Sequence, residues 1–424
     1  MSINTNLFQK FRSNKRLKQI ASLFSVNIIG IPIGMVTSIL LTRYLGAKSY
    51  GDFMFINNLI NLAVIIGTFG IFQAGNRAIV LTENKEKIKE YYGAEMIFTI
   101  GVFLIVFLFL FLFVNYDPNI NAKGLRLITL IVMPFSWVYI LVKYFEVLFQ
   151  ADNRIGLLVK TRLFPKIFFL ALVLLLFSFY QDYNDKKLIL IFYCFIVSQI
   201  IVFIYIIFKI KLSFNNLKLR LKEIWNYNKS FGFHVYIGSV FAVGFAQLTG
   251  ILISYFGIDN SGVGFYALAL TIAAPLSFIP NTIATTHYKD FSKLNSAPKK
   301  VLFLTLGITI VTLFLSWILI SPFIKYFYGI EFESVINLFY IVSIGIVLHG
   351  LADFYNRFLG AHGQGKILRN SSFIVGGSLL VFNIVLIPLY GEVGAAITKG
   401  VTGLIYFITI IYYYKKFKLK LLKN

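Results

Sequence analysis

Three basic side chains stand within or at the ends of long apolar stretches of this sequence: Arg43, Arg77 and Lys399. If those stretches cross a membrane, each charge costs roughly 3 kcal/mol or more unless it has a counter-charge or a water-filled cavity. Three such cations facing one cavity would form a path for an anion. The alternative is structural: Arg43 and Arg77 reach the head groups from helix ends, and Lys399 is a tether near Glu392.

Amide side chains form a second group with recognisable chemistry. Asn57 and Asn61 are four residues apart and share one helix face. Gln73 and Asn76 come shortly before Arg77. Amides inside a membrane either hydrogen-bond between helices or line a wet cavity, where they suit sugar hydroxyl groups. We therefore expect these four amides to be candidate sugar contacts.

Two carboxylates have basic neighbours at helical spacing. Lys143 and Glu146 are three residues apart, and Asp353 and Arg357 are four residues apart. Such pairs neutralise one another along a helix, so a structural role is favoured. A protonatable Glu146 or Asp353 would be the natural candidate for ion coupling.

The sequence lacks the signatures of catalysis and of cofactor or metal binding. It contains no Gly-rich phosphate loop of the G-x-x-x-x-G-K-[ST] kind. Cys194 is the single cysteine, which excludes a disulfide framework or a thiolate metal site. The four histidines share no ligand spacing: His234, His287, His349 and His362. We therefore expect no enzyme activity, no cofactor and no metal.

The composition indicates that lipid surrounds most of the chain. Of 424 residues, 58% are hydrophobic and 13% are charged, and the mean hydropathy is +0.79. Twelve stretches are long enough to span a bilayer, which takes roughly 20 apolar residues. They are about 20–42, 53–76, 92–114, 125–147, 157–180, 188–209, 231–256, 263–286, 299–320, 335–358, 370–388 and 393–415.

The positive charge, +23 in total, is concentrated on one side of these stretches. The basic segments are 1–20, 73–91, 143–166, 209–229, 287–300, 353–370 and 415–424. Because Lys and Arg stay in the cytoplasm during insertion, both termini are predicted to lie inside. The charge is thus a topology signal and does not indicate nucleic-acid binding. The residues before the first span are expected to lie as a short amphipathic segment on the inner surface.

The two halves resemble each other. The first contains ILLTRYLGAKSYGDFMF (39–55) and the second contains ILISYFGIDNSGVGFYALA (251–269), which aligns two glycines. A second match at nearly the same offset pairs 149–151 with 359–361. Two matches suggest a duplicated six-helix unit, and an even number of spans gives both copies the same orientation.

This repeat predicts the domain organisation. We expect a basic cytoplasmic segment (1–20), an N-lobe of spans 1–6 (21–209) and a basic linker (210–229). A C-lobe of spans 7–12 (230–415) and a basic tail (416–424) follow. The fold class is an all-α membrane protein with two parallel six-helix repeats.

These features together resemble the Wzx-type polysaccharide-unit flippases of the multidrug/oligosaccharidyl-lipid/polysaccharide exporter superfamily. The resemblance covers nearly the whole chain and rests on loose motifs. They are Asn27 with Gly30, Thr42-Arg43-Tyr44-Leu45-Gly46 with Tyr50-Gly51, Phe69-Gly70 with Arg77, and the six-plus-six repeat.

The resemblance implies a two-lobed, V-shaped transporter with a central cavity. It implies alternating access that carries an undecaprenyl-pyrophosphate-linked oligosaccharide, an O-antigen or capsule unit, to the outer leaflet of the bacterial cytoplasmic membrane. Arg43 and Arg77 match basic positions of the family, whereas Lys399 comes from this sequence alone. Membrane lipid, a polysaccharide polymerase and chain-length proteins are the implied partners. The alternatives are a multidrug or cation antiporter of the same superfamily and, less favoured, a membrane polysaccharide polymerase or ligase.

Overall fold

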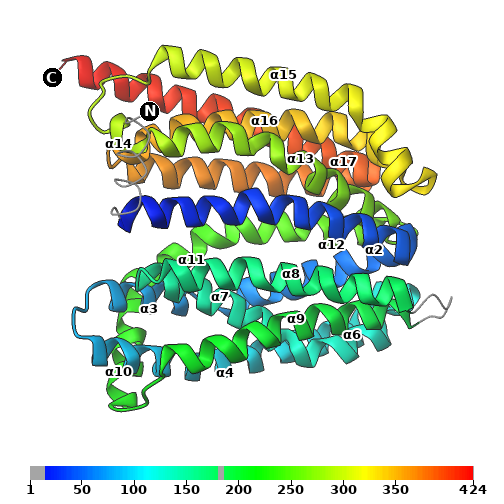
Figure 1. Cartoon of the computed structure of the whole chain (residues 1–424), viewed down its shortest axis with the longest axis horizontal. Helices are drawn as coiled ribbons and strands as arrows, with labels where there is room; N and C mark the ends of the chain where they lie inside the picture. The colour runs from blue at the N-terminus through cyan, green and yellow to red at the C-terminus, as the bar shows by residue number, and fades with distance from the viewer. Residues whose placement is uncertain (1–14, 180–185, 424) are drawn as a thin grey trace, which may run out of the picture. The chain divides into compact units, whose positions relative to one another are not determined.

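The computed structural model describes residues 15–179 and 186–423, and every regular element there is a helix (Figure 1). Residues 1–14 of the predicted basic segment 1–20 lie outside the described residues. The helix α2 begins at Lys15. The α-helices are α2 (Lys15–Gly67), α3 (Ile71–Val80), α4 (Lys85–Tyr116), α5 (Pro118–Ala122), α6 (Arg126–Val132), α7 (Ser136–Ala151), α8 (Ile155–Phe179), α9 (Lys187–Ile210), α10 (Leu217–Tyr227), α11 (Phe233–Ser239), α12 (Phe245–Phe256), α13 (Ser261–Thr286), α14 (Tyr288–Phe291), α15 (Lys299–Phe323), α16 (Ser334–Ala361) and α17 (Gly365–Lys423). Short 3₁₀ or π turns are η1 (Met133–Phe135), η2 (Asn228–Gly232), η3 (Val240–Gly244), η4 (Ile324–Tyr328) and η5 (Ile330–Phe332).

Ten helical runs of the described chain are long and apolar enough to cross a bilayer. Two of them contain a glycine with non-helical backbone: Gly46 in α2 (φ 73°) and Gly391 in α17 (φ 56°). Glycine adopts positive φ without a steric penalty, so a helix can stop there and the next can start at once. Division at these glycines gives twelve segments, and the predicted all-α membrane fold is confirmed.

The chain forms two compact units. Unit 1 contains the described residues up to Tyr44 and Ala63–Ile237. Unit 2 contains Leu45–Leu62 and the described residues from Gly238 onward. The first half of the second predicted span therefore packs with the C-terminal helices. The lobe boundaries at 209 and 230 stay a prediction.

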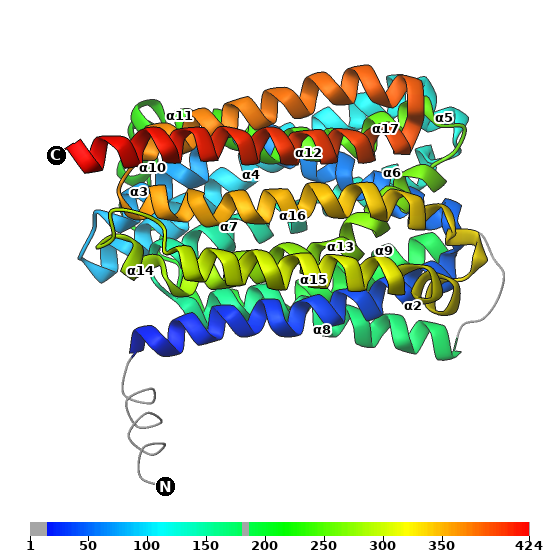
Figure 2. The same cartoon turned by 90° about the horizontal axis from the view of Figure 1, so that it is seen from above.

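Each unit is a bundle of long helices. In unit 1, α7 packs against α3, α4 and α8, and α8 lies along α9 (Figure 2). In unit 2, α16 packs between α13 and α17 (Figure 1). Glycines permit this close approach, because a Cβ on Gly345 of α16 would overlap the Lys399 carbonyl of α17. Small residues at contacts between helices are the usual means of tight packing in lipid.

Similar turns end α7 and α16. The left-handed residue is Asn153 in the first turn (φ 51°) and Gly363 in the second (φ 70°). The next amide donates a hydrogen bond across each turn, Arg154 N to Phe149 O at 3.0 Å and Gln364 N to Leu359 O at 3.1 Å. These bonds satisfy carbonyls that a helix end leaves free. The shared geometry supports the repeat at 149–151 and 359–361.

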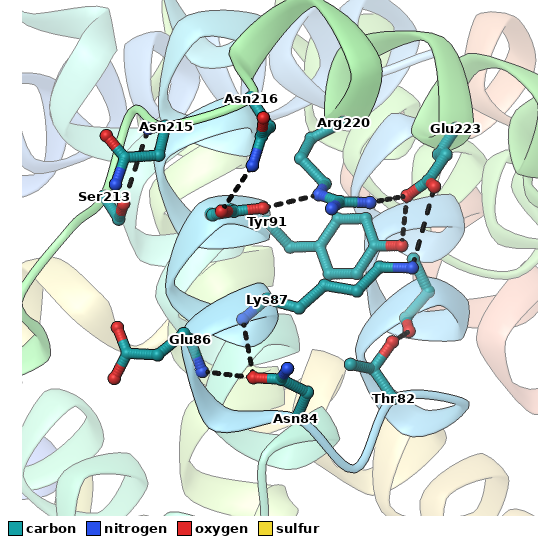
Figure 3. Close-up of polar contacts among 12 residues, drawn as sticks. Thr82, Asn84, Glu86, Lys87, Tyr91, Ser213, Asn215, Asn216, Arg220 and Glu223 are labelled. Atoms are coloured by element: carbon teal, nitrogen blue, oxygen red, sulfur yellow. Dashed lines mark hydrogen bonds and ion pairs between the residues drawn. The ribbon is translucent and has the colours of Figure 1, made fainter.

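The predicted linker contains α10, which docks on the beginning of α4 within unit 1 (Figure 3). Arg220 is buried, and its Nε donates to Glu90 Oε2 at 2.7 Å while its Nη1 donates to Glu223 Oε2 at 2.7 Å. Tyr91 also donates to Glu223, and Lys87 lies 3.6 Å from that carboxylate. This network holds the N-terminal turns of α4 in place.

Within unit 2, the α2 segment after Gly46 docks on the start of α13. Asn260 donates from Nδ2 to Asp52 Oδ1 at 2.7 Å, and Ser254 donates to Asn260 at 2.6 Å. All three side chains are buried. Gly51 contacts the Asn260 backbone so closely that an added Cβ would overlap its carbonyl.

Candidate functional site

A cavity of about 420 Å³ lies among four helices of unit 1, and we call it the unit 1 cavity. It is formed by α2, α7, α8 and α9, and α7, α8 and α9 lie side by side in Figure 1. Its lining residues are Val26, Val142, Glu146, Thr161, Arg162, Pro165, Lys166, Phe195 and Gln199. The cavity thus combines an apolar wall with several polar and charged groups.

The charges of the unit 1 cavity come mainly from α8. Arg162 and Lys166 are four residues apart, so both project from one helix face, and they interact with each other electrostatically. Arg162 forms an ion pair with Glu146 of α7. Among the described residues, Lys166 has no ion-pair partner. Two cations and one carboxylate leave one excess positive charge, which favours an anionic ligand.

Neutral polar groups complete the lining. The Oε1 atom of Gln199 on α9 is buried and has no hydrogen-bond partner in the described chain. The Thr161 hydroxyl donates to carbonyls of its own helix. On α2, a Cβ at Gly30 would lie 3.4 Å from Lys166 Nζ, an ordinary contact distance, so the lysine lies beside this part of α2. The Gln199 oxygen can accept a hydrogen bond from a hydroxyl group, and the two cations of the cavity can donate to an oxyanion.

The structure places the predicted cations in different surroundings. Arg43 is exposed near the Gly46 break of α2, and Arg77 is exposed at the end of α3, where its guanidinium lies 5.8 Å from the Phe231 ring centre. Both belong to unit 1, whereas Lys399 belongs to unit 2. Their predicted role in anion binding stays a prediction.

Lys399 lies near a polar cluster of unit 2. Tyr406 donates its hydroxyl to Asp353 Oδ1 at 2.9 Å and accepts from Asn356 Nδ2 at 2.7 Å. The His349 ring lies 4.4 Å from the Tyr406 ring, centre to centre. Lys399 interacts electrostatically with Asp353 and His349. The cluster joins α16 to α17.

Both carboxylates that were expected to pair along their own helix have other partners. Glu146 pairs with Arg162 of the next helix rather than with Lys143. Asp353 accepts a hydrogen bond from Tyr406, and in the described chain it has no ion pair with Arg357. The reason is that helix packing places a donor of a neighbouring helix within hydrogen-bond distance of each carboxylate.

The predicted amides bond mainly to nearby backbone. Asn57 donates to Phe53 O at 2.7 Å and Asn61 to Asn57 O at 2.8 Å, both within α2. On α3, Asn76 donates to Val147 O at 3.4 Å, and Gln73 keeps a buried Oε1 without a partner in the described residues. A sugar contact stays a prediction for all four amides.

Arg162, Lys166 and Gln199 were missed as candidate site residues. Arg162 and Lys166 fall inside the predicted span 157–180, but they also belong to the basic segment 143–166, whose charge indicates topology. Their four-residue spacing on an apolar helix was the signal that could have identified them. Gln199 gave no comparable signal.

Comparison with known proteins identifies the family. The profile of the family described as "Polysaccharide biosynthesis protein" matches residues 16–295. The chain belongs to this family. A curated relative is the capsular polysaccharide biosynthesis protein CapF of Staphylococcus aureus, which is 23% identical over 77% of this chain and 90% of CapF.

Solved structures show the same fold. The lipid II flippase MurJ in its inward closed conformation has a TM-score of 0.71 at 16% identity, over 94% of this chain and 89% of MurJ. A multidrug resistance MATE transporter of the MOP superfamily, in its inward-facing conformation, has a TM-score of 0.65 at 13% identity, over 96% and 98% of the two chains. This family member is therefore a multi-pass membrane protein with the fold of MOP transporters and flippases.

Proposed function

We propose that this protein is a flippase that carries an undecaprenyl-pyrophosphate-linked oligosaccharide, an O-antigen or capsule repeat unit, to the outer leaflet by alternating access. The observation that carries the proposal is the excess positive charge of the unit 1 cavity, where Arg162 and Lys166 accompany one carboxylate, Glu146. Membership of a polysaccharide biosynthesis family supports the sugar-linked substrate.

The physical problem of such a substrate is its head group. A sugar diphosphate cannot enter hydrocarbon alone, because its polar groups would lose their water without gaining partners. A cavity with basic and amide side chains replaces those partners. The prenyl tail needs no shelter and remains in the lipid.

The size of the unit 1 cavity suits part of this substrate. Its volume of about 420 Å³ is within the usual range of small-molecule sites, roughly 300–1,000 Å³. It can hold a diphosphate and an adjoining sugar, with Arg162 and Lys166 on the phosphate oxygens and Gln199 on a hydroxyl. Arg43, Arg77 and Lys399 are proposed as further anion contacts along the path.

The same proposal predicts where the protein is located, which proteins receive its product and what drives export. The protein would reside in a bacterial cytoplasmic membrane with both termini inside, and would deliver its product to a polysaccharide polymerase and chain-length proteins. A negative cell interior drives an anionic head group outward by about 2.3 kcal/mol per charge per 100 mV. The membrane potential is thus a source of energy for export.

The decisive experiment asks on which leaflet the lipid-linked oligosaccharide accumulates after deletion of the gene. We expect accumulation on the cytoplasmic leaflet, with transport restored by the unsubstituted protein in cells and in proteoliposomes. Normal delivery to the outer leaflet in the deletion strain would contradict the proposal. Export of cationic drugs by the proteoliposomes, without movement of the lipid-linked sugar, would identify a multidrug antiporter instead.

A further inference from the structure

Glu95 of α4 is a buried carboxyl group that the proposed anion site does not use. Its side chain has no exposed surface. Both of its oxygen atoms lack a hydrogen-bond partner in the described chain, and no ion pair to it is found there. Buried polar groups in proteins are nearly always hydrogen-bonded, so such a group calls for an explanation.

The contacts around Glu95 fit the carboxyl group closely. On α3, Gly75 lies directly against it, and a Cβ on this glycine would overlap Oε1 and Cδ of Glu95. Arg77 of the same helix is exposed and lies over Phe231. Any larger residue at Gly75 would displace the acid, so the pocket matches this side chain.

In the described chain, no hydrogen-bond donor or cation lies within bonding distance of the Glu95 oxygen atoms. Tyr144 of α7 and Tyr92 of α4 itself interact with Glu95 electrostatically. Both phenols donate elsewhere, Tyr144 to the backbone carbonyl of Tyr92 at 2.9 Å and Tyr92 to the carboxylate of Asp152. Ionisation of Glu95 here would create a buried charge without compensation. The neutral acid is the form that this pocket accommodates.

The helix that covers Glu95 is separated from the preceding one by an unusual break. Phe69 and Gly70 both have left-handed backbone, with φ of 44° and 81°. Positive φ is uncommon for a bulky residue such as Phe69 and stores strain. The break begins α3 as a separate short helix, which packs against α4, α7 and α10. Movement of α3 about this break would expose Glu95 to water.

We propose that Glu95 is a proton-binding site that is occupied in this conformation and is emptied when α3 moves away from α4. Binding adds one proton to the carboxylate, and release returns it to water on the side to which the site has opened. Coupled to the transport cycle, this exchange would let proton entry assist substrate export. Only this coupling rests on the proposed function; proton binding by Glu95 does not.

The first test measures the protonated acid directly by infrared spectroscopy of the full-length protein in lipid. At pH 7 the unsubstituted protein should show the C=O stretching band of a buried carboxylic acid. Glu95→Gln, a close match in shape to the neutral acid, should lose this band. Glu86→Gln is the matched control, because Glu86 is an exposed residue of the same helix that pairs with Lys89.

Two outcomes would overturn the proposal. One is the absence of the band at pH 7 in the unsubstituted protein, which needs no variant to fold. The other is a band of equal intensity in folded Glu95→Gln protein. Because neither measurement involves the oligosaccharide, the result stands even if the proposed function fails.

The second test measures coupling in proteoliposomes that contain the lipid-linked oligosaccharide. An imposed proton gradient should accelerate flipping by the unsubstituted protein and by Glu86→Gln, and this acceleration should be lost in Glu95→Gln. Acceleration that persists in Glu95→Gln, or is absent from the unsubstituted protein, would overturn the coupling. A complete lack of flipping by the unsubstituted protein would instead refute the proposed function and leave the infrared result as the test of Glu95.

Discussion

Lys166 is the residue on which the proposed anion site depends most directly. It lines the unit 1 cavity and has no ion-pair partner among the described residues, whereas Arg162 is partly neutralised by Glu146. A charged group without a counter-ion in a partly apolar cavity gains most from an arriving anion. The Lys166 ammonium should therefore contribute a full charge-assisted hydrogen bond to a phosphate oxygen.

We expect Lys166→Gln to weaken the binding of inorganic pyrophosphate to the purified protein about tenfold or more. One charge-assisted hydrogen bond contributes roughly 1.5–3 kcal/mol. Isothermal titration calorimetry at fixed salt measures the change. Lys160→Gln is the matched control, because Lys160 is on the same helix but donates to the Tyr205 hydroxyl at 2.7 Å, outside the cavity. Equal affinities for both variants would place anion binding elsewhere.

At the scale of helices, glycine contacts decide which elements pack together. Gly51 of α2 lies against the backbone of Asn260 at the start of α13, beside the buried hydrogen bond to Asp52. Gly34, on the same helix, has nothing within 4 Å of the position that a Cβ would take. Alanine at Gly51 would therefore disturb packing, whereas alanine at Gly34 would change only the helix preference of the residue.

Gly51→Ala should lower the apparent unfolding temperature of the detergent-solubilised protein, because overpacking costs about 1–3 kcal/mol. Gly34→Ala should leave that temperature unchanged or raise it, since alanine favours the helix by roughly 0.5–1 kcal/mol. Fluorescence-monitored thermal unfolding measures both. A Gly51→Ala protein as stable as Gly34→Ala would show that α2 and α13 do not pack as described.

Arg220 is the buried member of the network that docks α10 on α4. Arg220→Met would leave Glu90 buried without its main partner, and loss of one member of a buried ion pair costs roughly 3–5 kcal/mol. We expect α10 to detach, and limited proteolysis should then cut faster between residues 211 and 216. Lys218→Met, which changes an exposed residue of the same helix, should be cut at the original rate. Equal cutting of both variants would argue against docking by Arg220.

At the scale of the whole molecule, the distribution of charge predicts orientation. Because Cys194 is the single cysteine, a Cys194→Ser background permits site-specific labelling. In intact cells, a membrane-impermeant maleimide should label Asp259→Cys, in the turn between α12 and α13. It should not label Lys222→Cys, on α10, until the cells are opened. The reverse pattern would contradict cytoplasmic termini.

Much of the fold could be predicted from the sequence, because hydropathy and charge act over each span as a whole. Twelve apolar stretches and their basic flanks require no knowledge of tertiary contacts, and the structure divides at Gly46 and Gly391 to give the same number. The repeat at 149–151 and 359–361 was also readable, since turns have local sequence requirements.

The site was less predictable from the sequence, because lipid is as apolar as the contacts between packed helices. A membrane helix therefore carries little sequence signal for which face meets lipid and which meets its neighbours. The cation–carboxylate partnership of Arg162 with Glu146 could not be read from either helix alone. The complete burial of Glu95 against Gly75, twenty positions earlier in the chain, could not be predicted from the sequence either.

By itself, the sequence determined that the chain is an all-helical membrane protein, which segments are long and apolar enough to cross a bilayer and which family it resembles. These are properties of composition summed along continuous stretches. Only the tertiary structure decided that Arg162 and Lys166 share a cavity, that the segment after Gly46 packs with α13, and that the Glu95 oxygens have no hydrogen-bond partner among the described residues. Those facts depend on distances between helices, which side-chain shape and backbone approach set after the helices have formed.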